Sequence, residues 1–225
     1  VQAANVVGIV FQTDKNRIGQ AEKNVLGGDN KVHGLVMSVK NAATSQEWST
    51  YYNSKDNGLP NCSTKADNYK DISGYGNCEH IRTNRGNFDN YPAFKAAYDY
   101  NTSCPVPTTT TGWYLPSSGQ WWDIMQNLGG CPWLASSYEQ ESTYPYGDFK
   151  WTNQGNVPVT LNAWMSKIAT GSKDEFGNNS FWSSSEFFFH YSLARIWSIF
   201  FNGEVKCYFN NKWEGVGDVR PVLAF

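Results

Sequence analysis

The hydrophobic pattern near both ends of the chain is typical of β-strands. Residues 6–11 (VVGIVF) and 32–39 (VHGLVMSV) are short runs rich in β-branched side chains. After Phe181 the sequence again has the pattern of short strands separated by Gly and Asn turns, and residues 219–225 (VRPVLAF) predict a final strand. The sequence therefore predicts strands at both termini.

Between these strands one helix is clearly marked. Ser117 or Ser118 is a suitable N-cap, residues 118–128 follow the helical period, and Gly129 is placed to end the helix. Its predicted buried stripe is Trp121, Trp122, Met125 and Leu128.

Two weaker helices are predicted at 91–98 and 161–169, whereas residues 41–90 are rich in Ser, Asn, Asp and Gly with little period. We expect these residues to form long, ordered loops. Strands at both ends with helices between them predict a single α+β domain over residues 1–225, with the terminal strands adjacent.

Residues 195–201 alternate between two faces of a predicted strand. Trp197, Ile199 and Phe201 form the larger, regular set, which we expect to face the core. Asn202 and Gly203 predict a two-residue hairpin turn into a partner strand. The expected core set also includes Trp113, Leu115, Trp121 and Trp182.

The composition excludes several classes of protein. With 40% hydrophobic and 17% charged residues, the 225-residue chain is not a disordered polymer. The net charge of −2 leaves no basic stripe, so nucleic acid is not an expected partner. No apolar run approaches the roughly 20 residues of a membrane span, so direct membrane insertion is not expected either.

The five cysteines form no close pair of the C-x-x-C kind, which argues against a zinc or redox motif. The first four allow two disulfides in an exported protein, Cys62–Cys78 and Cys104–Cys131, or four reduced and buried thiols. Both alternatives remain open from the sequence.

Residues 187–191 (FFFHY) are unusual for a core strand. A strand directs successive side chains to opposite faces, so five large side chains in a row cannot all point inward. A fully buried strand is the alternative. Contiguous exposed apolar surface usually marks an interaction site, and rings with mixed charge are typical of binding surfaces. We therefore expect one exposed ligand-binding patch made of Phe187, Phe188, Phe189, His190, Tyr191, Ile196, Ser198, Phe200, Trp213, Glu214, Val216 and Asp218.

Three motifs occur in order along the second half of the chain: GWYLP at 112–116, FWSSSE at 181–186 and VRPVLAF at 219–225. With them the chain resembles bacterial surface proteins of the C-type-lectin-like fold, and most closely the variable proteins of diversity-generating retroelements. The resemblance is specific over about the last 115 residues. It implies a C-type-lectin-like ligand-binding domain whose segment 181–225 is rewritten at adenine-bearing codons.

In that family Asn codons are the usual targets of an error-prone reverse transcriptase. The resemblance implies a fixed frame at 181–186 and 219–225, with hypervariable positions between them. Residues reachable from an AAC codon are Phe187, Phe188, Phe189, His190, Tyr191, Ser192, Ile196, Ser198, Phe200, Cys207, Gly215, Val216, Gly217 and Asp218.

Other functional classes are less well supported. The same fold family includes formylglycine-generating enzymes, which depend on active-site cysteines, but here only Cys207 lies in the C-terminal region. G-x-S-x-G, H-E-x-x-H and P-loop motifs do not occur, so we expect no enzyme, catalytic residue or cofactor. The calcium-dependent sugar motifs E-P-N, Q-P-D and W-N-D do not occur either. Asp67, Asn68 and Asp71 could hold a cation, or could be a solvated loop, and no metal site is expected.

The expected function is an adhesion module at the cell surface, such as a pilus tip, that binds a protein or glycan on another cell or host surface. A phage tail is the alternative location. A structural pilus or virion subunit with a carbohydrate-binding C-type-lectin-like fold is the alternative function, and it predicts that residues 187–191 are buried.

Overall fold

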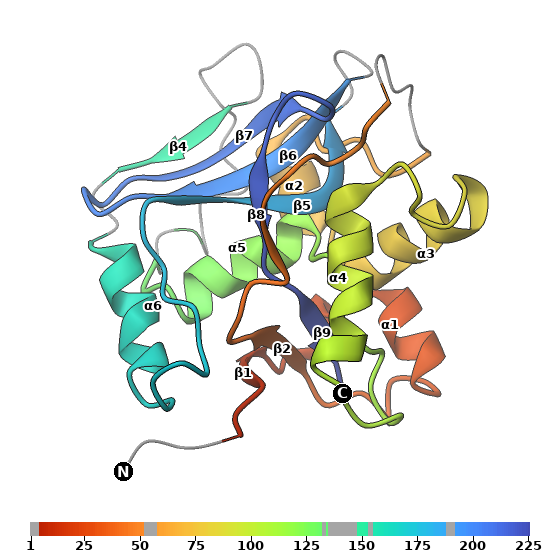
Figure 1. The fold of residues 1–225 in the computed structure, drawn as a ribbon, viewed down its shortest axis with the longest axis horizontal. Helices are drawn as coiled ribbons and strands as arrows, with labels where there is room; N and C mark the ends of the chain where they lie inside the picture. Colours follow the sequence, from red (N-terminus) through yellow and green to blue (C-terminus); the bar gives the residue numbers. More distant parts are fainter. Residues whose placement is uncertain (1–4, 52–57, 132–133, 135–147, 153–154, 188–191) are drawn as a thin grey trace.

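The structure is a computed structural model that describes residues 5–51, 58–131, 134, 148–152, 155–187 and 192–225. It contains two sheets and is an α+β fold, as predicted (Figure 1). The three-stranded sheet has the order β1 (Gly8–Gln12), β2 (Leu35–Ser38), β9 (Val222–Ala224). The six-stranded sheet has the order β3 (Ala43–Gln46), β8 (Gly217–Val219), β5 (Asn179–Phe187), β6 (Leu193–Ile199), β7 (Val205–Asn211), β4 (Phe149–Trp151).

The small sheet brings the two ends of the chain together. Both of its pairings are antiparallel, with Gly8 opposite Ser38 and Leu35 opposite Ala224. The terminal strands β1 and β9 therefore share a sheet, but β2 lies between them. The expectation that the terminal strands are adjacent is wrong in this detail, because the β1–β2 hairpin places β2 in the centre.

The predicted central helix forms as α5 (Ser118–Asn127), between the two sheets (Figure 1). Ser117 is its N-cap, and its backbone N–H donates to Oε1 of Gln120 at 3.0 Å. The indole N–H of Trp121 donates to the carbonyl of Trp182 at 3.0 Å, so the helix is bonded to β5 as well as packed on it. The helical stripe read from the sequence is buried.

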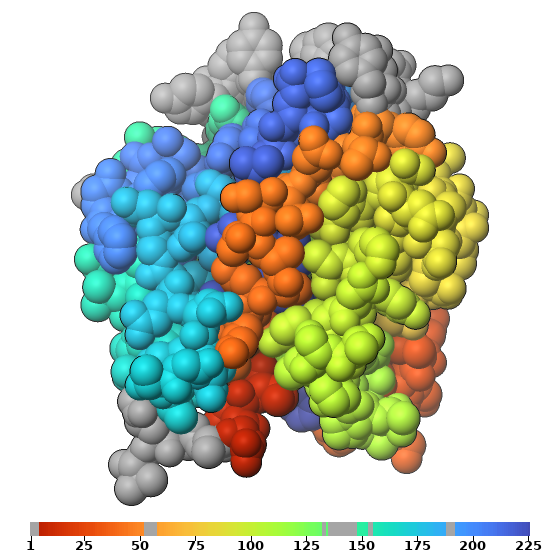
Figure 2. Space-filling model, viewed as in Figure 1, coloured from red at the N-terminus to blue at the C-terminus, as the bar shows by residue number. Residues whose placement is uncertain are grey.

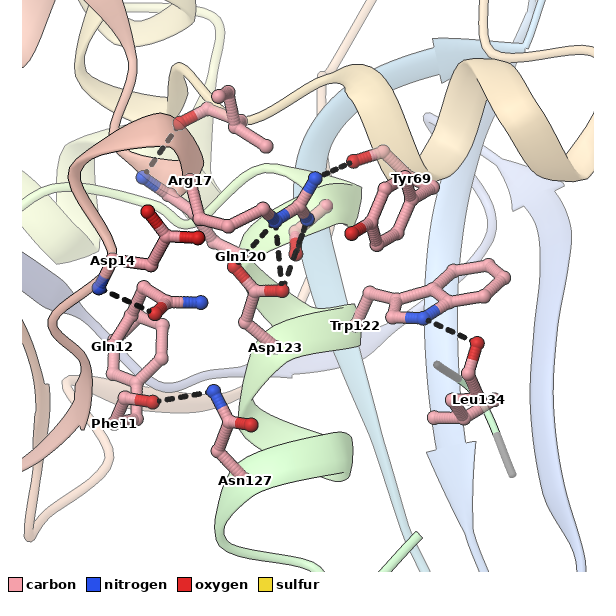
Figure 3. Close-up of polar contacts among 12 residues, drawn as sticks. Phe11, Gln12, Asp14, Arg17, Tyr69, Gln120, Trp122, Asp123, Asn127 and Leu134 are labelled. Atoms are coloured by element: carbon pink, nitrogen blue, oxygen red, sulfur yellow. Dashed lines mark hydrogen bonds and ion pairs between the residues drawn. The ribbon is translucent and has the colours of Figure 1, made fainter. Parts of the chain in front are cut away.

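A second contact fixes the N-terminal segment on α5. Arg17, in the 3₁₀ turn η1 (Lys15–Arg17), donates to both carboxylate oxygens of Asp123 and to the carbonyl of Tyr69 at 2.9 Å (Figure 3). Its guanidinium carbon lies 3.7 Å from the centre of the Tyr69 ring. Asn127, one turn further along α5, donates to the carbonyl of Phe11 at 2.8 Å. The cluster therefore joins β1, α5 and the helix that carries Tyr69.

The segment 41–90 is more regular than the sequence indicated. It contains β3, α2 (Lys65–Lys70) and α3 (Gly74–Asn84), so the expectation of long loops is wrong there. Thr64 and Asp67 form a capping box at the start of α2, and this Thr-x-x-Asp spacing was a readable signal. Figure 2 shows the segment that carries β3 (orange) at the surface, beside α4 (Pro92–Ser103).

The remaining helices are α1 (Gln20–Val25) and α6 (Val157–Met165). The weaker predictions at 91–98 and 161–169 are thus right about the helices but misplace their ends. For α4 and α6 a proline lies in the first turn, where a missing N–H costs nothing.

The larger hydrophobic cluster extends from Phe11 to Ala224, and Tyr100, Trp113 and Leu223 form a second, smaller cluster. Six of the seven predicted core residues are buried, namely Trp113, Leu115, Trp121, Trp182, Trp197 and Ile199. The seventh, Phe201, is 49% exposed. The hairpin explains this error: Phe200 N–H donates to Glu204, so 201–203 form a three-residue loop with Gly203 at φ +81°, and Phe201 lies in the turn.

All five cysteines are free, so the Cys62–Cys78 and Cys104–Cys131 disulfides are absent. The alternative of four reduced, buried thiols holds for Cys62, Cys78 and Cys131, whereas Cys104 is half-buried. Within the described ranges no helix has the length and apolar character needed to cross a membrane.

Candidate functional site

The predicted ligand-binding patch is only partly exposed. Phe187, at the end of β5, is 4% exposed, and its ring stacks on that of Phe209 with centroids 4.7 Å apart. The guanidinium carbon of Arg195 lies 4.3 Å from the centroid of the Phe187 ring. The expectation that Phe187 is a solvent-exposed anchor is therefore wrong. Phe188, Phe189, His190 and Tyr191 lie outside the described residues.

Ile196 and Ser198 are also buried, which contradicts their predicted exposure. They do lie on the face of β6 opposite Trp197, as the alternation predicted. However, β6 is an interior strand of the six-stranded sheet and is covered on both faces. A Cβ placed on Gly217 would lie 3.0 Å from Ile196 Cδ1, so the β8 segment covers Ile196. The hydroxyl of Ser198 bonds to that of Ser180 at 2.5 Å.

Part of this face does reach solvent at the hairpin end of the sheet. The register places Lys206 opposite both Ser198 and Lys150, and Tyr208 opposite Ile196, so these side chains share the outward face. Phe200 continues that face at the end of β6 and is half-buried, as are Lys206 and Tyr208. We call Lys150, Phe200, Glu204, Lys206 and Tyr208 the hairpin face.

Charge on the hairpin face is concentrated around one carboxylate. Lys150 and Lys206 are opposite each other, and like charges in that position repel. Glu204 accepts from both amines, at 2.6 Å from Lys150 and 2.8 Å from Lys206. These two hydrogen bonds lower the pKa of Glu204 below its ordinary value. The Lys206 amine also lies 5.2 Å from the centre of the Phe200 ring.

A pocket of about 440 Å³ opens beside these residues and is lined by Asp148, Phe149, Lys150, Phe200, Lys206 and Tyr208. Its volume lies in the range of small-molecule and glycan sites, roughly 300–1,000 Å³. The rings of this lining can stack on an apolar face of a ligand, and its two lysine amines can hydrogen-bond to acceptors. Of the predicted patch, this pocket contains Phe200.

The other exposed patch residues lie elsewhere. Trp213 is half-buried and Glu214 and Val216 are exposed, in the loop after β7. The six residue steps of β7 separate this loop from the hairpin turn by roughly 20 Å. Figure 2 shows the hairpin end (lighter blue, left) apart from the loop (darker blue, top). Asp218 is half-buried and accepts from Asn179 at 2.9 Å and from the Ser45 N–H at 3.2 Å. The predicted single patch is thus divided.

A buried polar network lies behind the W-S-S-S-E motif. Asp71 accepts from the Ser185 hydroxyl at 2.5 Å and from Asn77 at 3.1 Å. Burial raises the pKa of Asp71, and the hydrogen bond from Ser185 opposes this. Asn68 donates to the carbonyls of Cys62 and Thr64. The candidate cation ligands Asp67, Asn68 and Asp71 are thus on or next to α2 and bound to protein groups, and the described residues contain no metal-ligand cluster.

Sequence reasoning missed Lys150, on β4, and Tyr208, on β7, as members of the exposed surface. Tyr208 could have been found from the hairpin, because a partner strand alternates in step with the strand opposite it. Lys150 could not, since β4 is far away in sequence and only the β4–β7 register brings it beside Lys206.

Comparisons with known proteins give a fold neighbour. No family model matches the chain, and no curated protein matches it. Among solved structures, a fimbrial protein from Bacteroides ovatus ATCC 8483 matches with a TM-score of 0.56 and 20% sequence identity, over 98% of this chain. The chain spans less than half of that protein, 44% of its length. At this identity the likeness shows a shared fold.

Proposed function

We propose that this chain is a binding module of a bacterial surface assembly and that the hairpin face contacts a protein or glycan on another cell. The observation that carries the proposal is the grouping of Phe200, Lys206 and Tyr208 on an outward face beside a pocket of about 440 Å³. Rings with adaptable charged groups are typical of binding surfaces, where a few aromatic anchors supply most of the interface energy. The shared fold with a fimbrial protein supports a surface location.

The proposal includes the absence of catalysis. Burial raises the pKa of the thiols of Cys62, Cys78 and Cys207, which is the opposite of what a nucleophilic cysteine needs. Two buried carboxylates are found here: Glu186 ends the W-S-S-S-E motif, and Asp71 lies behind it. Asp71 accepts a hydrogen bond from Ser185, and Glu186 pairs with Lys212. These features support a structural use of the polar network.

The resemblance to retroelement-diversified proteins adds a more specific proposal, namely that the segment 181–225 is diversified by a retroelement. Of the positions reachable from an AAC codon, six of the described ones are buried, namely Phe187, Ile196, Ser198, Cys207, Gly215 and Gly217. Random replacement at buried sites would leave cavities or overpack the core. If the segment is diversified, we therefore expect tolerated variation at Phe200 and Val216 rather than at these six. A near-copy of the coding segment for 181–225, with AAC codons and beside a reverse transcriptase gene, would support the finer proposal.

A structural pilus or virion subunit is the second candidate, and one observation favours it: Phe187, the only described residue of the 187–191 run, is buried as that alternative predicts. The two candidates differ in what the purified chain binds. An adhesion module binds cells or glycans as a monomer, whereas a structural subunit binds copies of itself or other subunits.

The test compares the wild type with a triple variant, Phe200→Ser, Lys206→Ser and Tyr208→Ser, on glycan arrays and on bacterial and host cells. The control is Phe201→Ser, an exposed ring on the same hairpin that does not line the pocket. We expect the triple variant to lose binding and the control to keep it. Equal binding by the triple variant, or binding only between copies of this chain, would contradict the proposed function.

A further inference from the structure

A second pocket lies away from the hairpin face, between α3, α4 and the segment 111–114. Its volume is about 430 Å³, and the residues that matter here are Tyr75, Glu79, Arg82, Tyr98, Asn101 and Trp113. Tyr75, Glu79 and Arg82 follow one face of α3 at helical spacing, and Tyr98 and Asn101 face them from α4. In Figure 1 these helices are on the right, and the β6–β7 turn is on the left.

The inner wall of this pocket is rigid. The indole N–H of Trp113 donates to the carbonyl of Cys104 at 2.9 Å, and the Trp113 backbone N–H donates to Asn101 Oδ1 at 2.7 Å. Gly112 has φ +71°, and a Cβ there would lie 2.8 Å from Asn101 Oδ1. Tyr114 is bridged to Val222 of β9. The wall is therefore fixed before any ligand arrives, which reduces the entropy that binding costs.

The outer wall contains strained backbone. Phe88 has a φ value of 67°, a region that bulky residues rarely occupy. This conformation brings the buried Phe88 ring 5.5 Å from the ring of Tyr98 and 6.1 Å from that of Phe94. Strain of this kind persists where the surrounding structure holds it, and it is concentrated at binding sites. Here it supports the exposed Tyr98 ring at the rim.

The rim is balanced in charge and has free hydrogen-bonding groups. Arg82 donates to both oxygens of Glu79, at 2.9 Å and 2.5 Å, so the two charged residues of the lining neutralise each other. Within the described part of the chain, Nη1 of Arg82 and the hydroxyls of Tyr75 and Tyr98 make no hydrogen bond. The pocket thus offers ring faces, donors and acceptors without net charge.

We propose that this pocket binds a neutral sugar residue of a glycan. A sugar ring presents an apolar C–H face that packs on an aromatic ring, and its hydroxyls both donate and accept hydrogen bonds. An acidic sugar or a phosphate would meet the Glu79 carboxylate beside Arg82, so the ion pair disfavours anions. The site does not depend on the hairpin face, and either can fail without the other.

The test is saturation-transfer NMR with the methyl glycosides of glucose, galactose, mannose and N-acetylglucosamine. N-acetylneuraminic acid, inorganic phosphate and phenol are the comparison probes. The variants are Tyr98→Ala, Tyr98→Phe and Arg82→Met, and Phe201→Ala, which removes an exposed ring that lines neither pocket, is the matched control. Tyr98 is 53% exposed, so its removal should leave folding intact, which circular dichroism verifies.

We expect at least one neutral glycoside to bind, with affinity reduced at least tenfold in Tyr98→Ala and Arg82→Met, reduced less in Tyr98→Phe and unchanged in Phe201→Ala. Binding of none of the neutral glycosides, binding of only an anion or phenol, or equal binding by Tyr98→Ala and Arg82→Met would overturn the proposal. Loss of cell binding in the hairpin-face triple variant alone would leave this second site unaffected.

Discussion

Lys212 and Glu186 form an ion pair that is closed to solvent, with side chains 1% and 3% exposed. Glu186 ends the W-S-S-S-E motif on β5, and Lys212 lies just after β7. The Lys212 amine also lies 4.6 Å from the centre of a Trp48 ring system, and the Lys212 carbonyl accepts from the Ser49 N–H at 2.9 Å. The pair therefore joins three segments that are far apart in sequence.

Replacing one partner of this pair should be severe. Lys212→Met leaves the Glu186 carboxylate buried without its cation, and we expect a loss of about 3–5 kcal/mol in the free energy of unfolding. The double variant with Glu186→Gln removes both charges and should recover part of that loss. Urea denaturation of the three proteins measures this, and a loss below about 1 kcal/mol in Lys212→Met would show that the pair is not closed to solvent.

Phe187 and Phe201 provide a matched test of which aromatic residues belong to the core. Phe187 is 4% exposed and Phe201 is 49% exposed. Phe187→Ala should cost about 3–5 kcal/mol, whereas Phe201→Ala should change the free energy of unfolding by about 0.5 kcal/mol or less. Thermal or urea melts decide the point, and the reverse order of the two losses would be incompatible with the burial described.

The sequence was sufficient to predict part of the core but not where each strand ends. The period-2 alternation correctly put Trp197 and Ile199 on the inner face, and the capping signals correctly started α5 at Ser118. Phe201 was wrongly added because alternation continues in the sequence after β6 has ended at Ile199. Where a strand ends depends on the length of the hairpin loop. A two-residue turn at Asn202 and Gly203 would leave Phe201 in the strand, whereas the three-residue loop of 201–203 places it in the turn.

The candidate site was harder to predict for a physical reason. Alternation distinguishes two faces of a strand, but it does not show whether a second layer covers the outer face. Ile196 and Ser198 are buried because β8 and neighbouring side chains cover β6, which depends on contacts with residues such as Gly217 and Ser180. Phe200 lies just beyond the end of β6 and is only half-buried. Whether a residue on this face of β6 is exposed therefore depends on how far along the strand the covering layer extends, and the alternation pattern does not show this.

Glu22 predicts how stability depends on pH. Burial raises the pKa of Glu22 above its ordinary value, although hydrogen bonds from Ser73, the Tyr75 N–H and Gln120 act in the opposite direction. Between about pH 4.3, the unfolded value, and the raised folded value, the native state holds more protons than the unfolded state. The Glu22 contribution to the free energy of unfolding is therefore fully present below this window and is lost as pH rises through it.

Glu22→Gln removes this titration and keeps the shape of the side chain. The amide oxygen can accept from the Tyr75 N–H and from Gln120, as Glu22 Oε1 does at 3.0 Å and 3.1 Å. We expect the stability of the variant relative to the wild type to increase with pH across the window and then to level off. Urea denaturation from pH 4 to pH 8 measures the difference. A difference that does not change with pH would show that Glu22 is not responsible.

The most direct test of the central claim is an equilibrium titration of the target selected on the glycan or cell arrays, with the stability of each protein measured alongside. We expect single changes at Phe200, Lys206 and Tyr208 to Ala each to weaken binding, and the triple change to abolish it, because aromatic and cationic anchors supply most of the energy of such interfaces. Phe201→Ala should bind like the wild type, and each of the four single variants should remain folded, which a cooperative urea transition verifies. Undiminished affinity in the folded triple variant would contradict the assignment of the hairpin face as the binding surface.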